Sequence, residues 1–271
     1  MGNPDRSLVG DILWAPWSAV GWLGTLTWMG TIAATMLPLT LAVPFERFQN
    51  TLFQPATSWP LWLCLSPLHV TYDPGYDRSR VSILMMNHVT MLDANIACGA
   101  VPVPMCGLEN ASHLKIPGYG WLLKMSNAIP VRKGEGRLPG VVTAFRERAS
   151  RGISVLTFPE AHRTLDGKLR PFKTGVFRAA IEAGLPIVPI ASRGAYRMLP
   201  KGAFSIRPSK IEVYMGPQIE TEGLCEDDVP ALMERVREVL EGWIERKEML
   251  GHRCREPLAE PATEAPPSHE P

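Results

Sequence analysis

Cysteine is scarce and scattered in this chain of 271 residues. The five cysteines are Cys64, Cys98, Cys106, Cys225 and Cys254, and no two of them form a CxxC pair. An odd number at wide spacing argues against a disulfide framework and against a zinc site built on cysteine. The expected environment is therefore a reducing compartment.

Charge is absent from Ile12 to Phe45. Within this run, Trp17–Leu37 ends before Pro38 and matches the roughly 20 apolar residues that a spanning helix needs. A cleaved signal sequence is disfavoured because the first six residues are hardly basic. A buried helix of a soluble protein remains an alternative interpretation, because glycines and threonines make the run less apolar. We predict that residues 1–45 form a membrane anchor, either a spanning helix or a re-entrant hairpin.

Tryptophan is concentrated near the start of the chain. Six of the eight tryptophans lie in the first 62 residues, and this side chain prefers the headgroup region of a membrane. A second apolar patch, Trp59–Leu68, is too short to span a bilayer. Residues 46–67 are accordingly predicted to be an interfacial linker.

Acidic side chains are few between residues 112 and 150, where seven basic residues oppose two acidic ones. This local excess either attracts phosphate or anionic lipid, or is an ordinary solvated surface. At the other end, residues 256–271 hold five prolines and four glutamates. Such a composition cannot build a core, so residues 251–271 are predicted to be a disordered tail.

The region 68–250 alternates between two kinds of apolar pattern. Short apolar runs predict strands at 69–72, 81–86, 128–132, 153–158, 187–192 and 211–215. Segments near 91–100, 112–125, 139–150, 172–183 and 227–249 suit helices. Strands that alternate with helices indicate an α/β fold, with a mostly parallel central sheet flanked by helices.

The strongest chemical signal follows the second of these strands, where His88 and Asp93 stand five positions apart. On one helix they would lie on different faces. They can meet if His88 lies in the turn after the strand and Asp93 in the first helical turn, with Thr90 as N-cap. Such a pair suits proton transfer near neutral pH. The pair also fits a loose capping box, or a metal site that no nearby His or Cys completes.

A second polar group follows the strand at 153–158. Glu160 and Arg163 would lie at the carboxyl end of that strand, where open α/β sheets bind ligands. Arg163 can donate two hydrogen bonds to a phosphate, while Glu160 can bind a substrate hydroxyl or hold the arginine. Arg132 follows another short strand, and Lys173 precedes a helix, where free N–H groups favour an anion. Each residue taken singly also fits an ordinary surface.

These blocks together resemble the glycerolipid acyltransferase family. His88 to Asp93 is similar to its HxxxxD signature, and the run from Phe158 to Thr164 resembles its FPEGTRS block. Arg132 after Ile-Pro-Val, the run from Pro171 to Gly175 and the run from Pro186 to Ile190 resemble further blocks, in the same order, over residues 68–220. The greatest similarity is to bacterial 1-acylglycerol-3-phosphate acyltransferases. Ala161 and His162 depart from the usual Gly and Thr.

The resemblance implies an acyltransferase domain at 68–250 that moves a fatty acyl group from acyl-CoA or acyl-carrier protein to lysophosphatidate. It implies His88 as general base, oriented by Asp93. The implied acceptor-binding residues are Arg132, Glu160, Arg163, Thr164 and Lys173. No metal, no other cofactor and no nucleic-acid partner are implied. A cytosolic donor and a lipid acceptor imply an active site on the cytoplasmic face of a membrane.

Two other functions fit the same residues. One is acylation of another lysolipid, such as a lyso-ornithine lipid, on the same scaffold. The other is a non-catalytic membrane protein that binds lipid and retains an inactive His–Asp pair.

Overall fold

The computed structural model describes residues 7–116, 118–132, 139–256 and 258. Seven strands form one sheet in the order β1-β7-β6-β2-β5-β3-β4. Their bounds are β1 Leu68–Tyr72, β2 Ile83–Met86, β3 Met105–Asn110, β4 Ile129–Val131, β5 Ser154–Thr157, β6 Ile187–Arg193 and β7 Ile211–Met215. Every neighbouring pair is parallel except β6 and β7. The predicted α/β fold with a mostly parallel sheet is confirmed.

The parallel strands β6, β2, β5, β3 and β4 all end at one edge of the sheet. The register pairs Met85 of β2 with Thr157 of β5 and Met86 with Ile190 of β6, so these strands finish at nearly the same level. Residues that follow these strands are therefore brought together, as open α/β sheets do with their binding residues. We call this the catalytic edge of the sheet.

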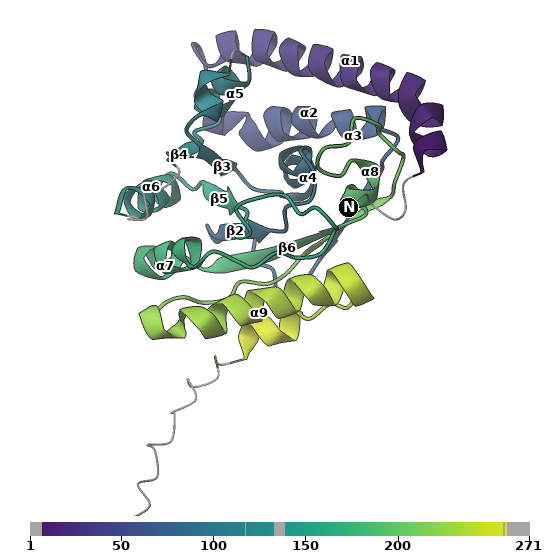
Figure 1. The fold of residues 1–271 in the computed structure, drawn as a ribbon. Helices are drawn as coiled ribbons and strands as arrows, with labels where there is room; N and C mark the ends of the chain where they lie inside the picture. The colour runs from purple at the N-terminus through teal and green to yellow at the C-terminus, as the bar shows by residue number, and fades with distance from the viewer. Residues whose placement is uncertain (1–6, 117, 133–138, 257, 259–271) are drawn as a thin grey trace, which may run out of the picture.

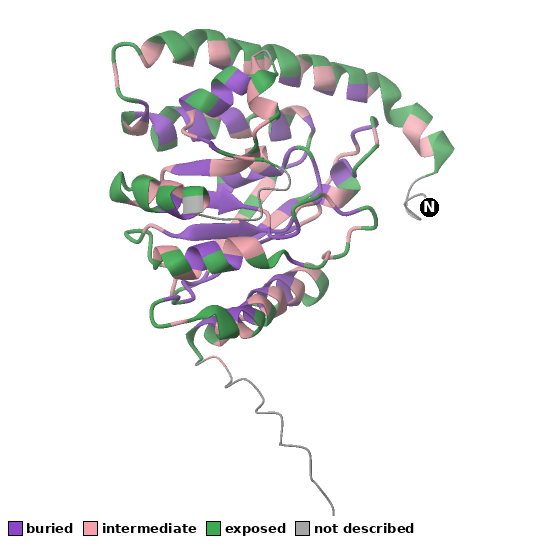
Figure 2. Cartoon of the chain, turned by 60° about the vertical axis from the view of Figure 1, so that its left-hand side comes forward, coloured by how far each residue is buried: buried purple, intermediate pink, exposed green. Residues whose placement is uncertain are grey.

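Helices cover both faces of the sheet (Figure 1). One face carries α1 Leu8–Leu39, α2 Gln54–Ser58, α3 Pro60–Leu63, α4 Asp93–Ala100 and α5 Tyr119–Met125. The other carries α6 Pro139–Ser150, α7 Thr174–Ala183 and α9 Val229–Glu241, and the short α8 Ala195–Met198 follows β6. Helix α1 lies outside α2, α3 and α5 (Figure 1). The sheet is buried on both faces (Figure 2).

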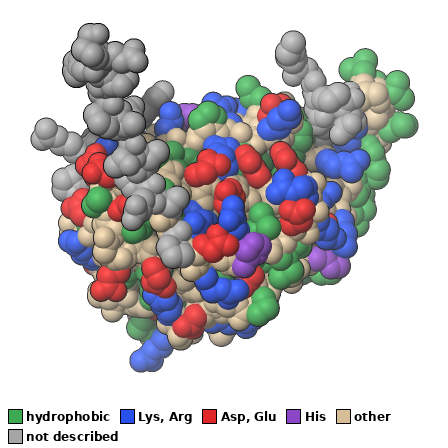
Figure 3. Space-filling model, turned by 90° about the horizontal axis from the view of Figure 1, so that it is seen from below, with side chains coloured by type: hydrophobic (Ala, Val, Ile, Leu, Met, Phe, Trp, Pro, Cys, Tyr) green, Lys and Arg blue, Asp and Glu red, His purple; other side chains and the backbone are tan. Residues whose placement is uncertain are grey.

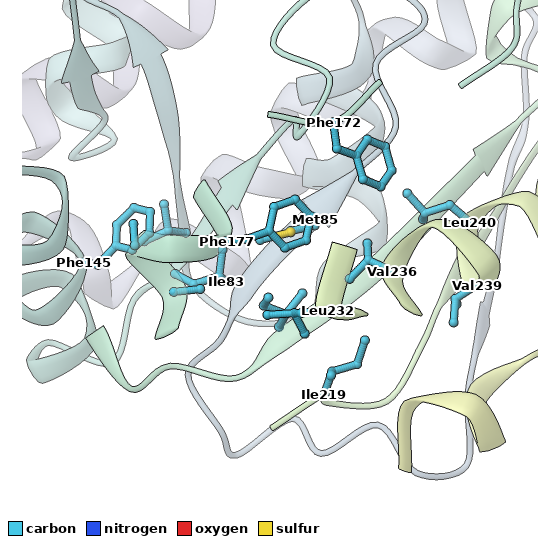
Figure 4. Close-up of a cluster of buried hydrophobic side chains, with 14 of the residues drawn as sticks. Ile83, Met85, Phe145, Phe172, Phe177, Ile219, Leu232, Val236, Val239 and Leu240 are labelled. Carbon is cyan, nitrogen blue, oxygen red and sulfur yellow. The ribbon is translucent and has the colours of Figure 1, made fainter. Parts of the chain in front are cut away.

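Strand β2 shows why this sheet is stable. All four of its side chains are buried, and successive side chains of a strand point to opposite faces. Ile83 and Met85 join the cluster under α6, α7 and α9 (Figure 4). Leu84 and Met86 join a second cluster that includes Ile96 of α4. A continuous apolar run is what a doubly covered parallel strand requires.

Some elements differ from the sequence prediction. Strand β3 was not predicted, and the predicted helix 112–125 is divided into a 3-10 turn, His113–Lys115, and α5. Gly118 (φ 77°) lies between them in a left-handed conformation, which ends a regular helix. Residues Gly251–Arg255, predicted to be disordered, form a 3-10 helix with Gly251 and Cys254 buried. The rest of the predicted tail, from residue 259, lies outside the described residues.

The apolar N-terminal segment forms a single helix, α1, which lies across the top of the domain (Figure 1). It runs past Pro38, and the chain then turns before the short helices between Phe45 and Leu63. The predicted linker 46–67 is thus largely helical. Ile32 of α1 is buried against Phe45, Phe48 and Phe53. Helix α1 is the one helix in the described residues that is long and apolar enough to cross a membrane, which is weak evidence for membrane association.

Candidate active site

The turn after β2 is held to the neighbouring strand by Asn87. Its side-chain Nδ2 donates to the carbonyl of Ser192 at 2.9 Å, and the Ser192 N–H donates to Asn87 Oδ1 at 2.7 Å. This two-way bond fixes the point at which β2 ends, next to the end of β6. His88 therefore begins the turn from a rigid position.

His88 and Asp93 meet at hydrogen-bond distance, with His88 Nδ1 2.8 Å from Asp93 Oδ2. As predicted, His88 lies in the turn and Asp93 is the first residue of α4. The His88 side chain is 22% exposed while Asp93 is 1% exposed. Because the carboxylate holds Nδ1–H, the lone pair of the neutral ring lies on Nε2. A base with one nitrogen fixed and the other open suits proton abstraction.

Asp93 also organises the backbone of the turn. Its Oδ2 accepts the N–H groups of Val89 at 2.7 Å and Thr90 at 2.9 Å, besides His88. Its Oδ1 is buried with no hydrogen-bond partner among the described residues. Burial raises the pKa of Asp93, and the hydrogen bonds from His88, Thr90 and Val89 partly offset it. The prediction that Thr90 is the N-cap of α4 is wrong. Leu92 takes that position, and the Asp93 carboxylate binds the turn instead.

Glu160 supports the same turn from the next strand of the sheet. Its Oε1 accepts the backbone N–H of His88 at 2.7 Å, and its Oε2 accepts that of Arg170 at 2.8 Å. The residue is 2% exposed, and burial raises the pKa of its carboxyl. Both oxygens are therefore already engaged. The geometry favours positioning of His88, rather than the predicted contact with the acceptor or with Arg163.

Thr164 likewise faces inward. Its backbone N–H donates to the His88 carbonyl at 2.9 Å. Its hydroxyl donates to Asp166 Oδ1 at 2.9 Å and accepts the N–H of Gly167 at 3.2 Å, and the residue is fully buried. The predicted substrate contact does not fit this geometry, because the hydroxyl shapes the loop after β5 instead.

Phe158 is a site residue that the sequence motifs did not single out. Its ring stacks on the imidazole of His88, with centroids 4.1 Å apart and planes at 17°. Phe158 follows directly after β5, the strand beside β2, so the sheet itself places one ring over the other. Its position in the FPEAHRT run was a signal that could have identified it.

Ala161 occupies a backbone conformation that favours glycine. Its φ is 59°, in the left-handed region that disfavours a residue with a Cβ. Its N–H donates to the Phe158 carbonyl at 2.9 Å, which closes a tight turn. The turn geometry thus gives a physical reason for the glycine usual in the motif that this chain resembles.

The basic residues lie at different distances from His88. Arg163 precedes Thr164, whose N–H contacts His88, and its side chain is partly exposed. Lys173 is the exposed N-cap of α7, and its N–H donates to Pro159 O at 2.8 Å, which draws the helix start to the same loop. Arg132 follows β4, three strands from β2, or roughly 14 Å at ~4.8 Å per strand. The backbone of Arg163 and Lys173 is therefore linked to the loop beside His88, whereas Arg132 follows a strand three positions away in the sheet.

A second histidine–carboxylate pair joins the end of β3 to the turn that follows it. His113 Nδ1 is 2.9 Å from Glu109 Oε2, four residues earlier. The His113 side chain is 44% exposed and that of Glu109 is 16% exposed, so this pair is more open to solvent than His88 and Asp93. Within the described ranges no group of three or more His, Cys, Asp or Glu side chains is arranged to hold a metal ion.

Comparison with known proteins shows which proteins this chain is similar to. Residues 72–193 match the family described as Acyltransferase. A 1-acyl-sn-glycerol-3-phosphate acyltransferase from Pseudomonas aeruginosa is 24% identical over 220 residues, covering 79% of this chain and 82% of the relative. The alpha enzyme of that name from Homo sapiens is 36% identical over 115 residues, covering 37% and 41%.

Two relatives from Limnanthes and one solved structure are also similar to this chain. The Limnanthes alba 1-acyl-sn-glycerol-3-phosphate acyltransferase is 26% identical over 182 residues, covering 66% of this chain. The chain spans 64% of that relative's length and 57% of its Limnanthes douglasii counterpart. The crystal structure of the 1-acyl-sn-glycerophosphate acyltransferase PlsC from Thermotoga maritima shares the fold, with a TM-score of 0.73 at 19% identity, covering 87% of this chain and 96% of that one. Residues 72–193 therefore resemble the acyltransferase family, and the fold of the chain resembles that of PlsC.

Proposed function

We propose that this protein transfers a fatty acyl group from a thioester, acyl-CoA or acyl-carrier protein, to the free hydroxyl of lysophosphatidate, giving phosphatidate. The observation that carries the proposal is the contact of His88 Nδ1 with the buried Asp93 carboxylate, which leaves Nε2 as the open base. Relatives named 1-acyl-sn-glycerol-3-phosphate acyltransferase support this choice of acceptor.

The proposed reaction needs one base and no covalent enzyme intermediate. His88 Nε2 takes the proton of the acceptor hydroxyl as its oxygen attacks the thioester carbonyl carbon. The tetrahedral intermediate collapses when the C–S bond breaks, and the imidazolium returns the proton to the leaving thiolate. Asp93 stabilises the imidazolium through Nδ1–H. General base catalysis of this kind contributes about 10²–10⁴-fold.

The acceptor phosphate requires cations at the catalytic edge. We assign this role first to Arg163, because it follows β5 next to the turn that carries His88. A guanidinium can donate two parallel hydrogen bonds to phosphate oxygens. Lys173 at the start of α7 adds positive charge on the same side. Arg132 is proposed as the outer contact of the same headgroup.

Membrane association is supported by the apolar side chains that the N-terminal part of α1 exposes. The buried residues of this part are small or polar, namely Ser18, Gly21 and Thr25, and the large apolar Ile32 is buried nearer the C-terminal end of the helix. The residues that face outward are large and apolar, namely Leu8, Val9, Ile12, Leu13, Val20, Leu23 and Leu26, each more than half exposed. A helix of a water-soluble protein has the opposite arrangement. By contrast, the face covered by α9 mixes basic and acidic side chains (Figure 3).

This arrangement favours a helix that lies in the membrane surface over one that crosses it. The N-terminal half of α1 bonds to the domain through Ser18, and its C-terminal half buries Ile32. A crossing helix would have to give up these contacts. We propose that the outward face of α1 rests in the cytoplasmic leaflet, because the thioester donors are cytosolic.

A substitution on the outward face tests this part of the proposal. Replacing both Leu13 and Leu23 with Gln should weaken sedimentation with phospholipid vesicles by at least tenfold, since burying each side chain is worth about 1.5–3 kcal/mol. Met249→Gln, an exposed residue beyond α9, is the matched control. We also expect weaker membrane association when residues 1–45 are removed, although that deletion uncovers Phe48 and Phe53, which pack against Ile32 and Phe45. Unchanged sedimentation of the double variant would contradict the proposal.

Thiol release by the purified full chain tests the reaction. Acyl-CoA and acyl-carrier protein would each be offered with lysophosphatidate, lysophosphatidylcholine and a lyso-ornithine lipid. We expect release that depends on lysophosphatidate, with phosphatidate as product. Release with another lysolipid alone would assign a different acceptor, and no release with any would favour a non-catalytic lipid-binding protein.

A further inference from the structure

The connection between α8 and β7 projects an aromatic side chain into solvent. Phe204 is 68% exposed, which is unusual for a residue held in a fixed position. Its ring stacks on Trp22 of α1, with centroids 5.7 Å apart. Trp22 Nε1 donates to the Phe204 carbonyl at 2.8 Å. The exposed ring is therefore attached to α1, although 182 residues separate it from Trp22.

Two further contacts make the attachment rigid. The Ile206 N–H donates to Ser18 Oγ at 2.8 Å in a buried position. Arg207 forms an ion pair with Asp11 of α1 at 2.8 Å. Gly202 (φ 83°) closes the turn that precedes Phe204. The segment Lys201–Arg207 is thus fixed to α1 through Phe204, Ile206 and Arg207.

The chemistry of this segment matches a lipid surface. Phe204 is an exposed apolar side chain in contact with Trp22 of α1, and the exposed Lys201 stands three residues before it. An aromatic ring that enters the acyl chains and a lysine that meets phosphate headgroups are the usual pair at an anionic membrane. We propose that Lys201–Arg207 is a second membrane-contacting element, which inserts Phe204 into an anionic phospholipid bilayer beside α1. This inference rests on the membrane association proposed above.

The contact would also orient the active site. The segment follows β6, whose end lies beside the end of β2 on the catalytic edge. Tyr196 of α8 donates its hydroxyl to the Leu165 carbonyl at 2.6 Å, and the neighbouring Thr164 bonds to His88. Leu165 is itself 63% exposed. Two points of attachment, α1 and Phe204, would hold this edge of the sheet against the bilayer that contains the acceptor.

A fluorescent label placed at residue 204 tests the insertion. The full chain would carry Phe204→Cys together with Cys225→Ser, because Cys225 is the exposed cysteine of the described chain. An environment-sensitive dye at position 204 should shift its emission to the blue on vesicles of phosphatidylcholine and phosphatidylglycerol. Nitroxide groups on the lipid chains should quench it. The same dye on native Cys225, just before α9 on the opposite face, is the matched control and should do neither.

A second measurement uses unlabelled protein. Phe204→Ser should weaken vesicle partitioning by roughly tenfold, since burying a Phe side chain is worth at least one power of ten, while Phe204→Trp should bind as tightly as wild type. Turnover with acceptor in detergent micelles should be unchanged in both variants. If wild type binds vesicles but the label at 204 behaves like that at Cys225, or Phe204→Ser binds normally, this inference is wrong. If wild type does not bind vesicles, the proposed membrane association is wrong, and so is this inference, which rests on it.

Discussion

Phe158 and His88 lie face to face, with ring centroids 4.1 Å apart, at the ends of adjacent parallel strands. The imidazole is thus held on one face by an aromatic ring and at Nδ1 by the Asp93 carboxylate. Both contacts restrict its rotation about the side-chain bonds. If His88 is the base, as proposed, this preorganisation means that it loses less freedom when the acceptor hydroxyl approaches Nε2.

Loss of the Phe158 ring should slow turnover without weakening acceptor binding. We expect Phe158→Ala to lower kcat about tenfold, because an aromatic stack is worth about 0.5–1.5 kcal/mol. KM for lysophosphatidate should stay near its wild-type value. Phe158→Tyr keeps the stack and should restore kcat. Steady-state kinetics separate these effects, and an equal loss in both variants would contradict a positioning role.

Ala161→Gly should stabilise the protein. Ala161 holds φ at 59°, a conformation that costs an L-residue about 1–2 kcal/mol. Part of that gain is offset because glycine is more flexible in the unfolded chain, so we expect a net increase of about 1 kcal/mol in the free energy of unfolding. Urea denaturation measures it, and Gly152→Ala, at a second left-handed position (φ 73°), should lower the stability instead. A destabilised Ala161→Gly variant would contradict the turn geometry.

Arg163→Ala should raise KM for lysophosphatidate by about 10- to 100-fold, because a hydrogen bond to a charged group is worth about 1.5–3 kcal/mol. The matched control is Arg178→Ala on α7, where the arginine pairs with exposed Glu226 at 2.8 Å. That change should leave KM unaltered. Initial rates over a range of acceptor concentrations provide the comparison. An unaltered KM in Arg163→Ala would point to an acceptor that lacks this phosphate.

The buried Asp93 should make stability depend on pH. Burial raises the pKa of Asp93 in the folded protein above the value of about 4 expected in the unfolded chain. Between these two values the folded state holds more protons, so the free energy of unfolding falls as pH rises through this window. Asp93→Asn cannot ionise and should show a smaller fall. Glu160, whose pKa is also raised, should account for part of the fall that remains in Asp93→Asn.

Urea denaturation at several pH values from 4.5 to 8 would compare the two proteins. The stability difference between Asp93→Asn and wild type should move in favour of the variant as pH rises. A difference that moved in favour of wild type instead would show that the pKa of Asp93 is lowered in the folded protein.

The sequence predicted much of this fold because the central strands have a simple pattern. Ile83 to Met86 is continuously apolar, as a strand covered on both faces must be. Strand β3 escaped prediction because Pro102 and Pro104 precede it and Gly107, Glu109 and Asn110 give it no apolar period. Helix α1 is uncharged and largely apolar from Ile12 to Leu39, so its pattern alone could not tell a buried segment from a membrane segment.

The sequence could predict only those contacts of the site that join residues within one turn of the chain. His88 and Asp93 are five residues apart, and local geometry brings them together. The role of Glu160 was missed because its partner, the His88 N–H, is 72 residues away and is a backbone group. The stack of Trp22 on Phe204 depends on how α1 docks, which no local pattern encodes.

Thiol release from acyl-CoA in the presence of lysophosphatidate, compared between His88→Ala and His113→Ala, is the sharpest test of His88 as the general base. Both histidines lie within 3 Å of a carboxylate, at 2.8 Å and 2.9 Å, but only His88 lies in the turn held by Asp93 and Glu160. His88→Ala should lower the rate by about 10²–10⁴-fold or more, with vesicle binding and unfolding near wild type, and His113→Ala should leave the rate nearly unchanged. Turnover at the wild-type rate in His88→Ala would show that this imidazole is not the base.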